Sequence, residues 1–308
     1  MVNLLSPAKV NLRLDVLSRR ADSYHNILSL MQLVDLSDEV EVSLGGRGPT
    51  EIEVFCHSTK WASLVPQGEG NLAYRAAQGF TSASGLRQGV RISIRKMIPV
   101  GAGLGGGSSN AAAVLLALQS LSRKKMSKKS LILLARRIGA DVPFFLFGHP
   151  AWASGIGDIL TRVKIPFPLW FVLVYPGFSI STRWAYEQLD ARRASRGPAL
   201  SKAKGLTKKI RNIRITKEKE FKDLEELVGI LHNDLEEVSL GAYPEIVKAK
   251  QDLLTEGARG DLMTGSGSTV FGLFLDESSA RIASQKITGK GWEVYCVRGI
   301  TGWGVDKR

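Results

Sequence analysis

A glycine-rich stretch, Pro99–Ser109, is the part of this sequence best suited to chemistry. It reads Pro-Val-Gly-Ala-Gly-Leu-Gly-Gly-Gly-Ser-Ser and leads into the helix-forming run Ala111–Leu118. Glycine lets the backbone approach an anion closely and adopt positive φ angles that other residues resist. A helix N-terminus behind such a loop offers free N–H groups and the positive end of the helix dipole. The stretch therefore predicts a phosphate-binding loop.

Three known glycine-rich loops compete for this stretch. A P-loop requires Gly-x-x-x-x-Gly-Lys-Ser/Thr, and no lysine stands at that place. Gly101, Gly103 and Gly106 match the dinucleotide pattern Gly-x-Gly-x-x-Gly. That pattern also needs an acid about 20 residues further on to hold a ribose, whereas 120–125 is basic. The third loop, which the segment closely resembles, is that of the GHMP kinases.

Lys9 and Asp141 are charged residues that could act beside such a loop. Lys9 interrupts an alternating apolar strand pattern, where a lysine is costly unless an anion pairs with it. Asp141 precedes Pro143, and alone it is read either as a solvated carboxylate or as one facing a site. Phosphoryl transfer to an alcohol needs a base for the hydroxyl proton and cations for the moving charge. Together the two residues predict such a pair.

Tyr24 and His25 stand side by side in a polar segment. An aromatic face beside a hydrogen-bonding ring suits a flat heterocycle such as a nucleobase, although the pair alone favours a solvated surface loop. The other histidines, His57, His149 and His232, have no carboxylate or cysteine pattern around them. The sequence therefore predicts no protein-held metal and no serine triad.

The periodicity of apolar residues predicts an alternation of strands and helices. Expected strands cover 10–16, 27–36, 39–44, 51–55, 90–95, 169–175, 270–275 and 292–297. Expected helices cover 72–83, 111–118, 127–138, 182–189, 222–228, 233–238, 244–254 and 278–286. Asn71 is a suitable N-cap for the first helix. The strands at 39–44 and 51–55 look like a hairpin around 45–49, and Gly139–Leu146 reads as a sharp turn.

Length and composition indicate an ordinary globular protein. The 308 residues are enough for two domains, and 44% are apolar and 23% charged. No run of about 18 apolar residues predicts a membrane span, and no signal peptide is visible. Cys56 and Cys296 lack metal or redox spacing and indicate free thiols. We therefore expect a cytoplasmic protein with no membrane partner.

The net charge of +13 is concentrated in one region. Between Arg192 and Lys219 the sequence is rich in lysine and arginine, and Glu218 is its single acid. Basic runs can mark nucleic-acid contact, but this one lacks the interleaved aromatic residues that single-strand binders use for stacking. A solvated basic insertion near 191–220 is the favoured interpretation, and a nucleic-acid-binding module remains the alternative.

Seven segments in order resemble the GHMP kinases, and within them the branch that acts on a cytidyl-linked sugar alcohol. They are Ser6–Leu12, Arg20–His25, Pro99–Ala112, Gly139–Pro143, Gly155–Asp158, Pro176–Thr182 and Gly265–Thr269. The glycine loop alone identifies only the superfamily, whereas the Tyr-His segment and Pro-Gly-x-x-Ile-x-Thr point to the cytidyl branch. Ser23 stands where that branch usually has glycine, and Ser154 where it often has Glu or Arg.

This resemblance implies an α+β fold with two domains. An ATP-binding, ribosomal-protein-S5-like domain would span 1–164, and a ferredoxin-like substrate domain would span 165–308. The implied reaction is transfer of the γ-phosphoryl of ATP, with Mg²⁺ on the nucleotide, to the 2-hydroxyl of 4-diphosphocytidyl-2-C-methyl-D-erythritol in non-mevalonate isoprenoid synthesis. The partner would be this small molecule rather than nucleic acid. A homoserine or mevalonate kinase is the nearest rival, and the oligomeric state stays open.

The resemblance also assigns roles to residues. Lys9 and Asp141 would be catalytic. Asn11, Tyr24, His25 and Tyr186 would bind the substrate, with the cytosine between Tyr24 and Tyr186 and its edge against His25. ATP would be bound by Asn71, Lys96, Pro99, Val100, Gly101, Ala102, Gly103, Leu104, Gly105, Gly106, Gly107, Ser108 and Ser109.

Overall fold

The computed structural model describes residues 1–46, 48–56, 59–123, 125–195 and 219–304. The strands are β1 (Val2–Arg19), β2 (His25–Leu44), β3 (Glu51–Cys56), β4 (Val90–Lys96), β5 (Ala151–Gly155), β6 (Ile159–Lys164), β7 (Trp170–Tyr175), β8 (Lys219–Glu220), β9 (His232–Asn233), β10 (Gly260–Met263), β11 (Val270–Phe274) and β12 (Glu293–Ile300). The helices are α1 (Leu72–Ser84), α2 (Gly106–Leu121), α3 (Lys128–Ile138), α4 (Val142–Phe147), α5 (Thr182–Ser195), α7 (Leu224–Val228), α8 (Glu236–Ala242), α9 (Pro244–Thr255) and α10 (Glu277–Thr288). Short 3-10 helices cover Thr59–Leu64 and Gly68–Gly70.

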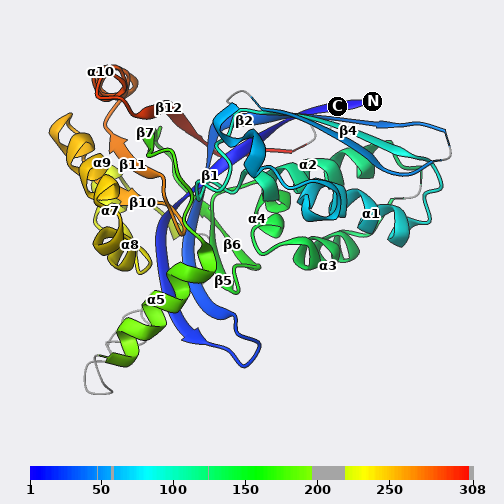
Figure 1. Ribbon diagram of the computed structural model, residues 1–308, viewed down its shortest axis with the longest axis horizontal. Helices are drawn as coiled ribbons and strands as arrows, with labels where there is room; N and C mark the ends of the chain where they lie inside the picture. The colour runs from blue at the N-terminus through cyan, green and yellow to red at the C-terminus, as the bar shows by residue number, and fades with distance from the viewer. Residues whose placement is uncertain (47, 57–58, 124, 196–218, 305–308) are drawn as a thin grey trace.

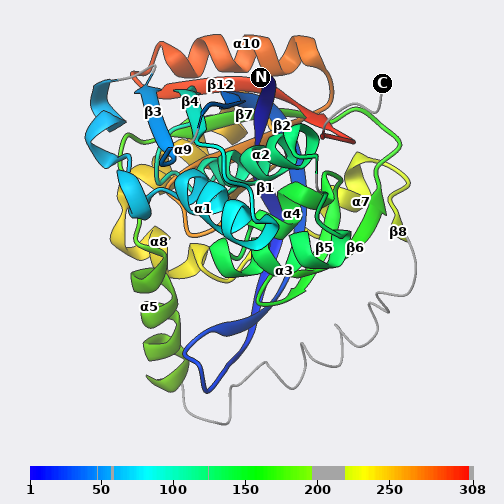
Figure 2. The ribbon, with the colours of Figure 1, turned by 90° about the vertical axis from the view of Figure 1, so that its right-hand side faces the viewer.

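Two long antiparallel strands, β1 and β2, run through the middle of the molecule. Figure 1 shows α1, α2, α3 and α4 on one side of them and α7, α8, α9 and α10 on the other. Figure 2 looks onto the first side and shows α1 to α4 lying in front of the strands. In both views α5 projects beside the turn that joins β1 to β2. The predicted mixture of helices and strands is confirmed.

The central strand pairing joins both halves of the chain. β12 is hydrogen-bonded to β7 on one side and to β2 on the other, with Cys296 opposite Val172 and Ile300 opposite Leu33. One buried cluster lies between the sheet and α1 to α3, and a second mixes residues of both halves, such as Val10 and Phe171. The domain division at 164/165 therefore remains a prediction.

Strand pairing corrects one expectation from the sequence. β3 does not pair with β2 as a hairpin, because β4 lies between them. Val42 of β2 stands opposite Ile92 of β4 in antiparallel register, and Ile52 of β3 stands opposite the same Ile92 in parallel register. Alternation of apolar residues identifies strands but not their partners, so the hairpin prediction was wrong.

Side-chain caps set the start of two helices, and burial sets the start of a third. The Asn71 carboxamide accepts the N–H of Ala73 at 3.0 Å, which confirms the predicted N-cap of α1. Ser127 caps α3 by accepting the N–H of Ser130 at 3.1 Å. α2, however, begins at Gly106 rather than at 111. Glycine and serine have low helix propensity, and burial of this turn overrides that preference.

No described helix is long and apolar enough to cross a membrane.

Candidate active site

The glycine loop adopts a backbone that needs glycine at three places. Gly101, Gly103 and Gly105 have φ angles of 71°, 80° and 73°. A Cβ atom on Gly103 would also stand 2.4 Å from the Thr264 carbonyl oxygen. Because L-residues resist positive φ and no side chain fits there, the loop is held against the segment that begins at Thr264.

The last glycines of the loop lie at the N-terminus of α2. Gly105 occupies the N-cap position and makes no side-chain cap hydrogen bond. The first N–H groups of a helix have no partner within it, and an anion is a suitable partner for them. A Cβ atom on Gly107 would meet only Leu72 Cδ1, at 3.9 Å, so the approach to this end of α2 is open.

Lys9 and Asp141 are brought together beside this loop, although they are 132 positions apart in the sequence. The Lys9 ammonium donates to Asn11 Oδ1 at 2.5 Å and to the Gly103 carbonyl oxygen at 2.8 Å. Its Nζ lies 4.0 Å from Asp141 Oδ2. Burial lowers the pKa of Lys9, and the charge of Asp141 opposes that shift. The amine is therefore held at the loop by two hydrogen bonds and one ionic contact.

Asp141 keeps its carboxylate accessible. The expected sharp turn is in fact the start of α4, and Asp141 is its N-cap residue without a side-chain cap hydrogen bond. The Asp141 side chain is 34% exposed, while the Lys9 side chain is 5% exposed. A carboxylate that is not used to cap its own helix can accept a proton from an approaching hydroxyl.

Asn11 is fixed in the same place. Its Nδ2 donates to Ser29 Oγ at 2.8 Å, and its backbone N–H donates to Thr264 Oγ1 at 2.9 Å. Its Oδ1 accepts from Lys9. Asn11 therefore orients Lys9 in this structure, and its predicted contact with the substrate remains a prediction.

Lys96 and Asn71, both predicted to bind ATP, have partners within the protein. The Lys96 ammonium pairs with the buried Asp38 carboxylate and donates to Asn110 Oδ1 at 3.2 Å. A Cβ atom on Gly106 would lie 3.0 Å from Lys96 Nζ, so Lys96 packs against the start of α2. Asn71 caps α1. Their roles toward ATP remain predictions.

The residues predicted to hold the cytosine are only partly assembled. The His25 ring stacks on the Tyr186 ring, with centroids 4.7 Å apart and planes 23° from parallel. Tyr24 is 59% exposed and follows Ser23, which has a φ angle of 67°. The structure thus brings His25 and Tyr186 together but leaves Tyr24 in solvent. The stacking of cytosine between Tyr24 and Tyr186 remains a prediction.

Tyr186 lies between this aromatic pair and Asp141 in its electrostatic contacts. Burial raises the pKa of the Tyr186 phenol, and the negative charges of Asp141 and Asp234 raise it further. The phenol therefore lies within electrostatic range of the Asp141 carboxylate. One site can hold a heterocycle at Tyr186 and a phosphate at the glycine loop.

Three residues of this site were missed in the sequence. Thr264 binds Asn11 and adjoins the Gly265–Thr269 segment, so that segment could have indicated it. Asp38 receives N–H groups of Met97 and Ile98 at 2.7 and 2.9 Å, and Asp190 contacts His25. No spacing or composition signal distinguishes Asp38 or Asp190 from ordinary surface acids.

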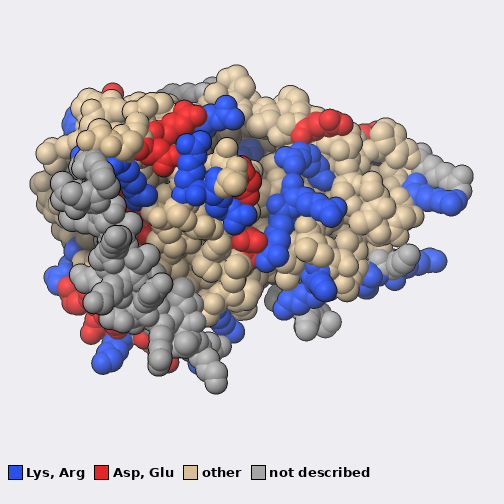
Figure 3. All heavy atoms as spheres, turned by 90° about the horizontal axis from the view of Figure 1, so that it is seen from below, with Lys and Arg blue, Asp and Glu red and all other residues tan. Residues whose placement is uncertain are grey.

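Basic side chains gather on one face of the molecule. Figure 3 shows lysine and arginine side chains gathered across the middle of the face seen from below. The basic insertion predicted near 191–220 lies for the most part outside the described residues. Its described flank, Arg192 and Arg193 on α5, forms ion pairs with Glu237 and Asp234.

In the described part of the chain, no group of three or more His, Cys, Asp or Glu could hold a metal ion.

Comparison with known proteins agrees with this arrangement. Residues 71–149 match the family model for the GHMP kinases N terminal domain, and residues 211–293 match the model for the GHMP kinases C terminal domain. A 4-diphosphocytidyl-2-C-methyl-D-erythritol kinase of Syntrophus aciditrophicus (strain SB) is 45% identical over 301 residues, which cover 97% of this chain and 100% of the relative.

Solved structures show the same relationship. A crystal structure of 4-(cytidine 5'-diphospho)-2C-methyl-D-erythritol kinase is 35% identical, with a TM-score of 0.73 over 98% of this chain and 100% of that chain. Mevalonate kinase of L. major in complex with R-mevalonate has a TM-score of 0.75 at 14% identity, over 98% of this chain and 96% of that chain, and so shares the fold. The chain therefore belongs to the GHMP kinase superfamily and, within it, to the 4-diphosphocytidyl-2-C-methyl-D-erythritol kinases.

Proposed function

We propose that this chain transfers the γ-phosphoryl of ATP to the 2-hydroxyl of 4-diphosphocytidyl-2-C-methyl-D-erythritol, with Lys9 and Asp141 as the catalytic pair. The observation that carries the proposal is the position of this pair. Lys9 Nζ and Asp141 Oδ2 are 4.0 Å apart, and Lys9 also binds the carbonyl of Gly103 within the glycine loop. A base and a cation thus stand where a loop-bound phosphate would meet a hydroxyl.

In this mechanism Asp141 accepts the hydroxyl proton while the oxygen attacks the γ-phosphorus. Lys9 stabilises the negative charge that spreads over the transferred phosphoryl group. The hydrogen bonds from Lys9 to Asn11 and Gly103 hold the ammonium in place before the substrate arrives. Catalysis of this kind consists mainly of positioning and charge stabilisation, for which a buried, fixed lysine is suited.

The nucleotide would lie along Pro99–Ser109, with its phosphates at the N-terminus of α2. Mg²⁺ would enter on the nucleotide, because Mg²⁺ keeps several waters and usually takes one or two carboxylates besides the phosphates. The Ser108 hydroxyl is an oxygen-bearing side chain that fits this need, and Asp141 stays available for the hydroxyl proton. Ser108 Oγ lies 3.8 Å from where a Cβ atom on Gly139 would stand, two residues before Asp141. ATP affinity measured with and without Mg²⁺ tests this independently of turnover.

The cytidyl group would lie at the other end of the site. We propose that it packs against Tyr186, that His25 reads its edge and that Tyr24 closes over it. The stacking of His25 on Tyr186 supports this placement, since the structure brings the two rings together. Asn11 would contact the reacting end of the substrate.

A coupled assay of ADP production with a panel of alcohols tests the proposed function. The panel contains the cytidyl substrate, its uridyl analogue, homoserine and mevalonate. We expect turnover with the cytidyl substrate at least about ten-fold above the others in kcat/KM, on the scale of one good contact. Faster turnover of homoserine or mevalonate would assign the chain to another GHMP activity.

We also propose that the enzyme works in the cytoplasm and acts on this small molecule without nucleic acid. Cys56 and Cys296 are free thiols, as is usual in a reducing compartment. The net charge of +13 is the observation that favours the alternative, a nucleic-acid-binding module. Filter binding of DNA and RNA against salt concentration separates the two, because phosphate contacts weaken steeply as salt rises.

A further inference from the structure

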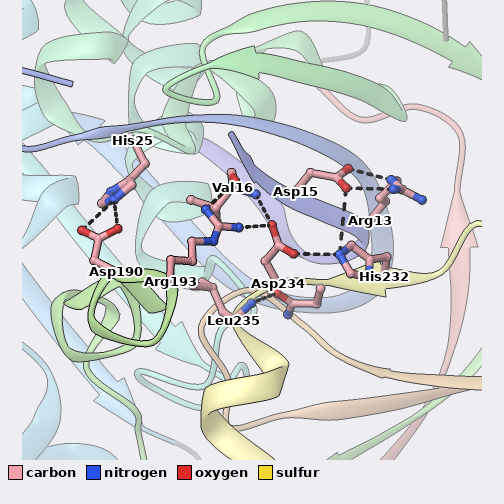
Figure 4. Close-up of polar contacts among 10 residues, drawn as sticks. Arg13, Asp15, Val16, His25, Asp190, Arg193, His232, Asp234 and Leu235 are labelled. Atoms are coloured by element: carbon pink, nitrogen blue, oxygen red, sulfur yellow. Dashed lines mark hydrogen bonds and ion pairs between the residues drawn. The ribbon is translucent and has the colours of Figure 1, made fainter. Parts of the chain in front are cut away.

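Helix α5 presents three side chains to the turn between β1 and β2. Tyr186, Asp190 and Arg193 are four and three residues apart, which places them on one face of the helix. Tyr186 stacks on His25, and Asp190 binds the same histidine ring. Figure 4 shows Asp190 reaching from α5 to His25, with Arg193 beside it reaching to Val16 and Asp234.

Asp190 contacts one particular atom of His25. The Nε2 atom lies 3.1 Å from one carboxylate oxygen of Asp190 and 3.2 Å from the other. The His25 side chain is only 8% exposed, so its ring has little freedom to turn away. Arg19 lies 3.7 Å from the same carboxylate and gives it a cationic contact.

This contact determines which ring nitrogen carries the proton. An ionised carboxylate only accepts hydrogen bonds, so the Nε2 atom of His25 must be the donor. In a neutral imidazole the other nitrogen, Nδ1, then holds a lone pair and acts as an acceptor. Asp190 thereby leaves Nδ1 of His25 as an acceptor, which a pyrimidine lying against this edge of the ring would meet.

An acceptor at this position can distinguish the two pyrimidines. Cytosine carries a 4-amino group, which donates, whereas uracil carries an oxygen at the same place, which accepts. An Nδ1 lone pair forms a hydrogen bond with the amino group but faces a second lone pair when uracil is bound. A site that mispairs a polar group discriminates strongly against that ligand.

We infer that Asp190 is a positioning residue that makes His25 selective for a cytidyl over a uridyl substrate, by holding the tautomer protonated at Nε2. The inference rests on the proposed function, because it assumes that a pyrimidine lies against His25. Asp190 acts only through His25 and needs no contact with the substrate.

The test compares kcat/KM for the cytidyl and uridyl substrates in the wild type and in Asp190→Asn. The asparagine side chain has nearly the same shape, but its amide can either accept or donate, so both tautomers of His25 become possible. We expect the cytidyl-to-uridyl ratio to fall about 5- to 150-fold, the range for one mispaired buried group. The change should lie mainly in KM, since Asp190 is not at the reacting atoms.

Arg193→Gln is the matched control, because Arg193 also anchors α5, three residues further on. It donates to the Val16 carbonyl oxygen at 2.8 Å and to Asp234 at 2.9 Å, but it does not touch His25. If Asp190 served only to hold α5, both variants would lower the ratio alike, which would overturn the inference. We expect Arg193→Gln to leave the ratio unchanged.

A second measurement does not depend on activity. The ¹⁵N chemical shifts of the His25 ring nitrogens report which one is protonated, and we expect Nε2–H in the wild type and a mixture in Asp190→Asn. A protonated Nδ1 in the wild type, or identical spectra in both proteins, would overturn the inference. If the wild type fails to use the cytidyl substrate, the proposed function fails, and the spectra still decide whether Asp190 sets the tautomer.

Discussion

Lys9 is a buried charge that its neighbours stabilise. A buried lysine is costly unless its ammonium is hydrogen-bonded and paired. Here Asn11 and the Gly103 carbonyl supply the hydrogen bonds, and Asp141 supplies the charge from 4.0 Å. Because Lys9 does not depend on a short contact with Asp141, the carboxylate can take the proton that the proposed mechanism assigns to it.

Asp141→Asn tests the base directly. Loss of a general base typically lowers the rate by about 10²–10⁴-fold, and asparagine keeps the shape of the side chain. We expect kcat to fall within this range while the Kd for ATP, measured by fluorescence titration, stays within about two-fold of wild type. Near wild-type turnover would show that another group takes the proton.

Lys9→Met tests the cation while keeping the apolar stem of the side chain. Removing one group that stabilises transition-state charge costs about 10²–10³-fold in kcat. We expect that loss in a protein whose circular dichroism spectrum and cooperative unfolding are unchanged. If the variant unfolds, and its folded fraction retains full specific activity, Lys9 is only a structural partner of Asp141.

Tyr186→Ala tests the pyrimidine end of the site. Stacking of a base on an aromatic ring contributes about 1–3 kcal/mol, so the KM for the cytidyl substrate should rise about 5- to 150-fold. The KM for ATP should change little, because we propose that the nucleotide lies at the glycine loop. Tyr186→Phe is the control and should retain the wild-type KM, since it keeps the ring. An equal rise in both KM values for Tyr186→Ala would argue against a pyrimidine at this ring.

At the scale of elements, the glycine loop connects β4, α2 and the Thr264–Thr269 segment. The Thr269 N–H donates to the Ala102 carbonyl at 3.3 Å, and Gly103 approaches Thr264 too closely for any side chain. The loop is therefore shaped by its neighbours as well as by its own glycines.

Gly103→Ala should disturb this contact. A Cβ atom would stand 2.4 Å from a carbonyl oxygen on a residue with φ of 80°, so the loop must move away. We expect a loss of about 1–3 kcal/mol in the free energy of unfolding and a higher KM for ATP. Gly241→Ala is the control. Gly241 lies in α8 with no neighbour within 4 Å, and alanine there should leave stability unchanged or raise it by up to about 1 kcal/mol.

The elements also show what the sequence could predict. α1 begins directly after its predicted N-cap, Asn71, and α3 begins at Lys128, one residue after the expected start, because capping is local chemistry. The hairpin prediction was wrong because the partner of β2 is β4, from a distant part of the chain. The pairing of Lys9 with Asp141 was anticipated from the chemistry that each could supply. The contact of Asp190 with His25 depends on how α5 docks, which no local pattern in the sequence records.

At the scale of the whole molecule, a polar network ties β1 to α5 and to the start of α8. Asp234 accepts the Val16 N–H at 2.7 Å and an Arg193 N–H at 2.9 Å, and His232 Nε2 lies 2.9 Å from its other oxygen (Figure 4). The hydrogen bond to Asp234 raises the pKa of His232 above its usual value. Burial alone would raise the pKa of Asp234, but its bonds to His232 and Val16 outweigh this and lower it.

These shifts predict a pH-dependent stability. Protonated His232 stabilises the fold through Asp234. This contribution is complete below the unfolded-state pKa of about 6.5 and is lost as pH rises through the higher folded-state pKa. The ionised Asp234 carboxylate contributes fully to stability above about pH 3.8, and this contribution is lost as pH falls through its lowered folded-state pKa. We expect the Tm difference between wild type and His232→Gln to be larger at about pH 5 than at about pH 9. A difference that grows with pH would contradict this assignment.

The position of β12 affects the order in which the strands can pair during synthesis. This strand ends at residue 300, yet it lies between β7 and β2 and is hydrogen-bonded to both. During synthesis from the N-terminus, β2 and β7 leave the ribosome long before the strand that joins them. Until then the edge of β7, and residues Leu33 and Val34 of β2, lack this partner, and open strand edges can pair wrongly or aggregate. The edge of β7 is therefore closed only after nearly all of the described chain has been made.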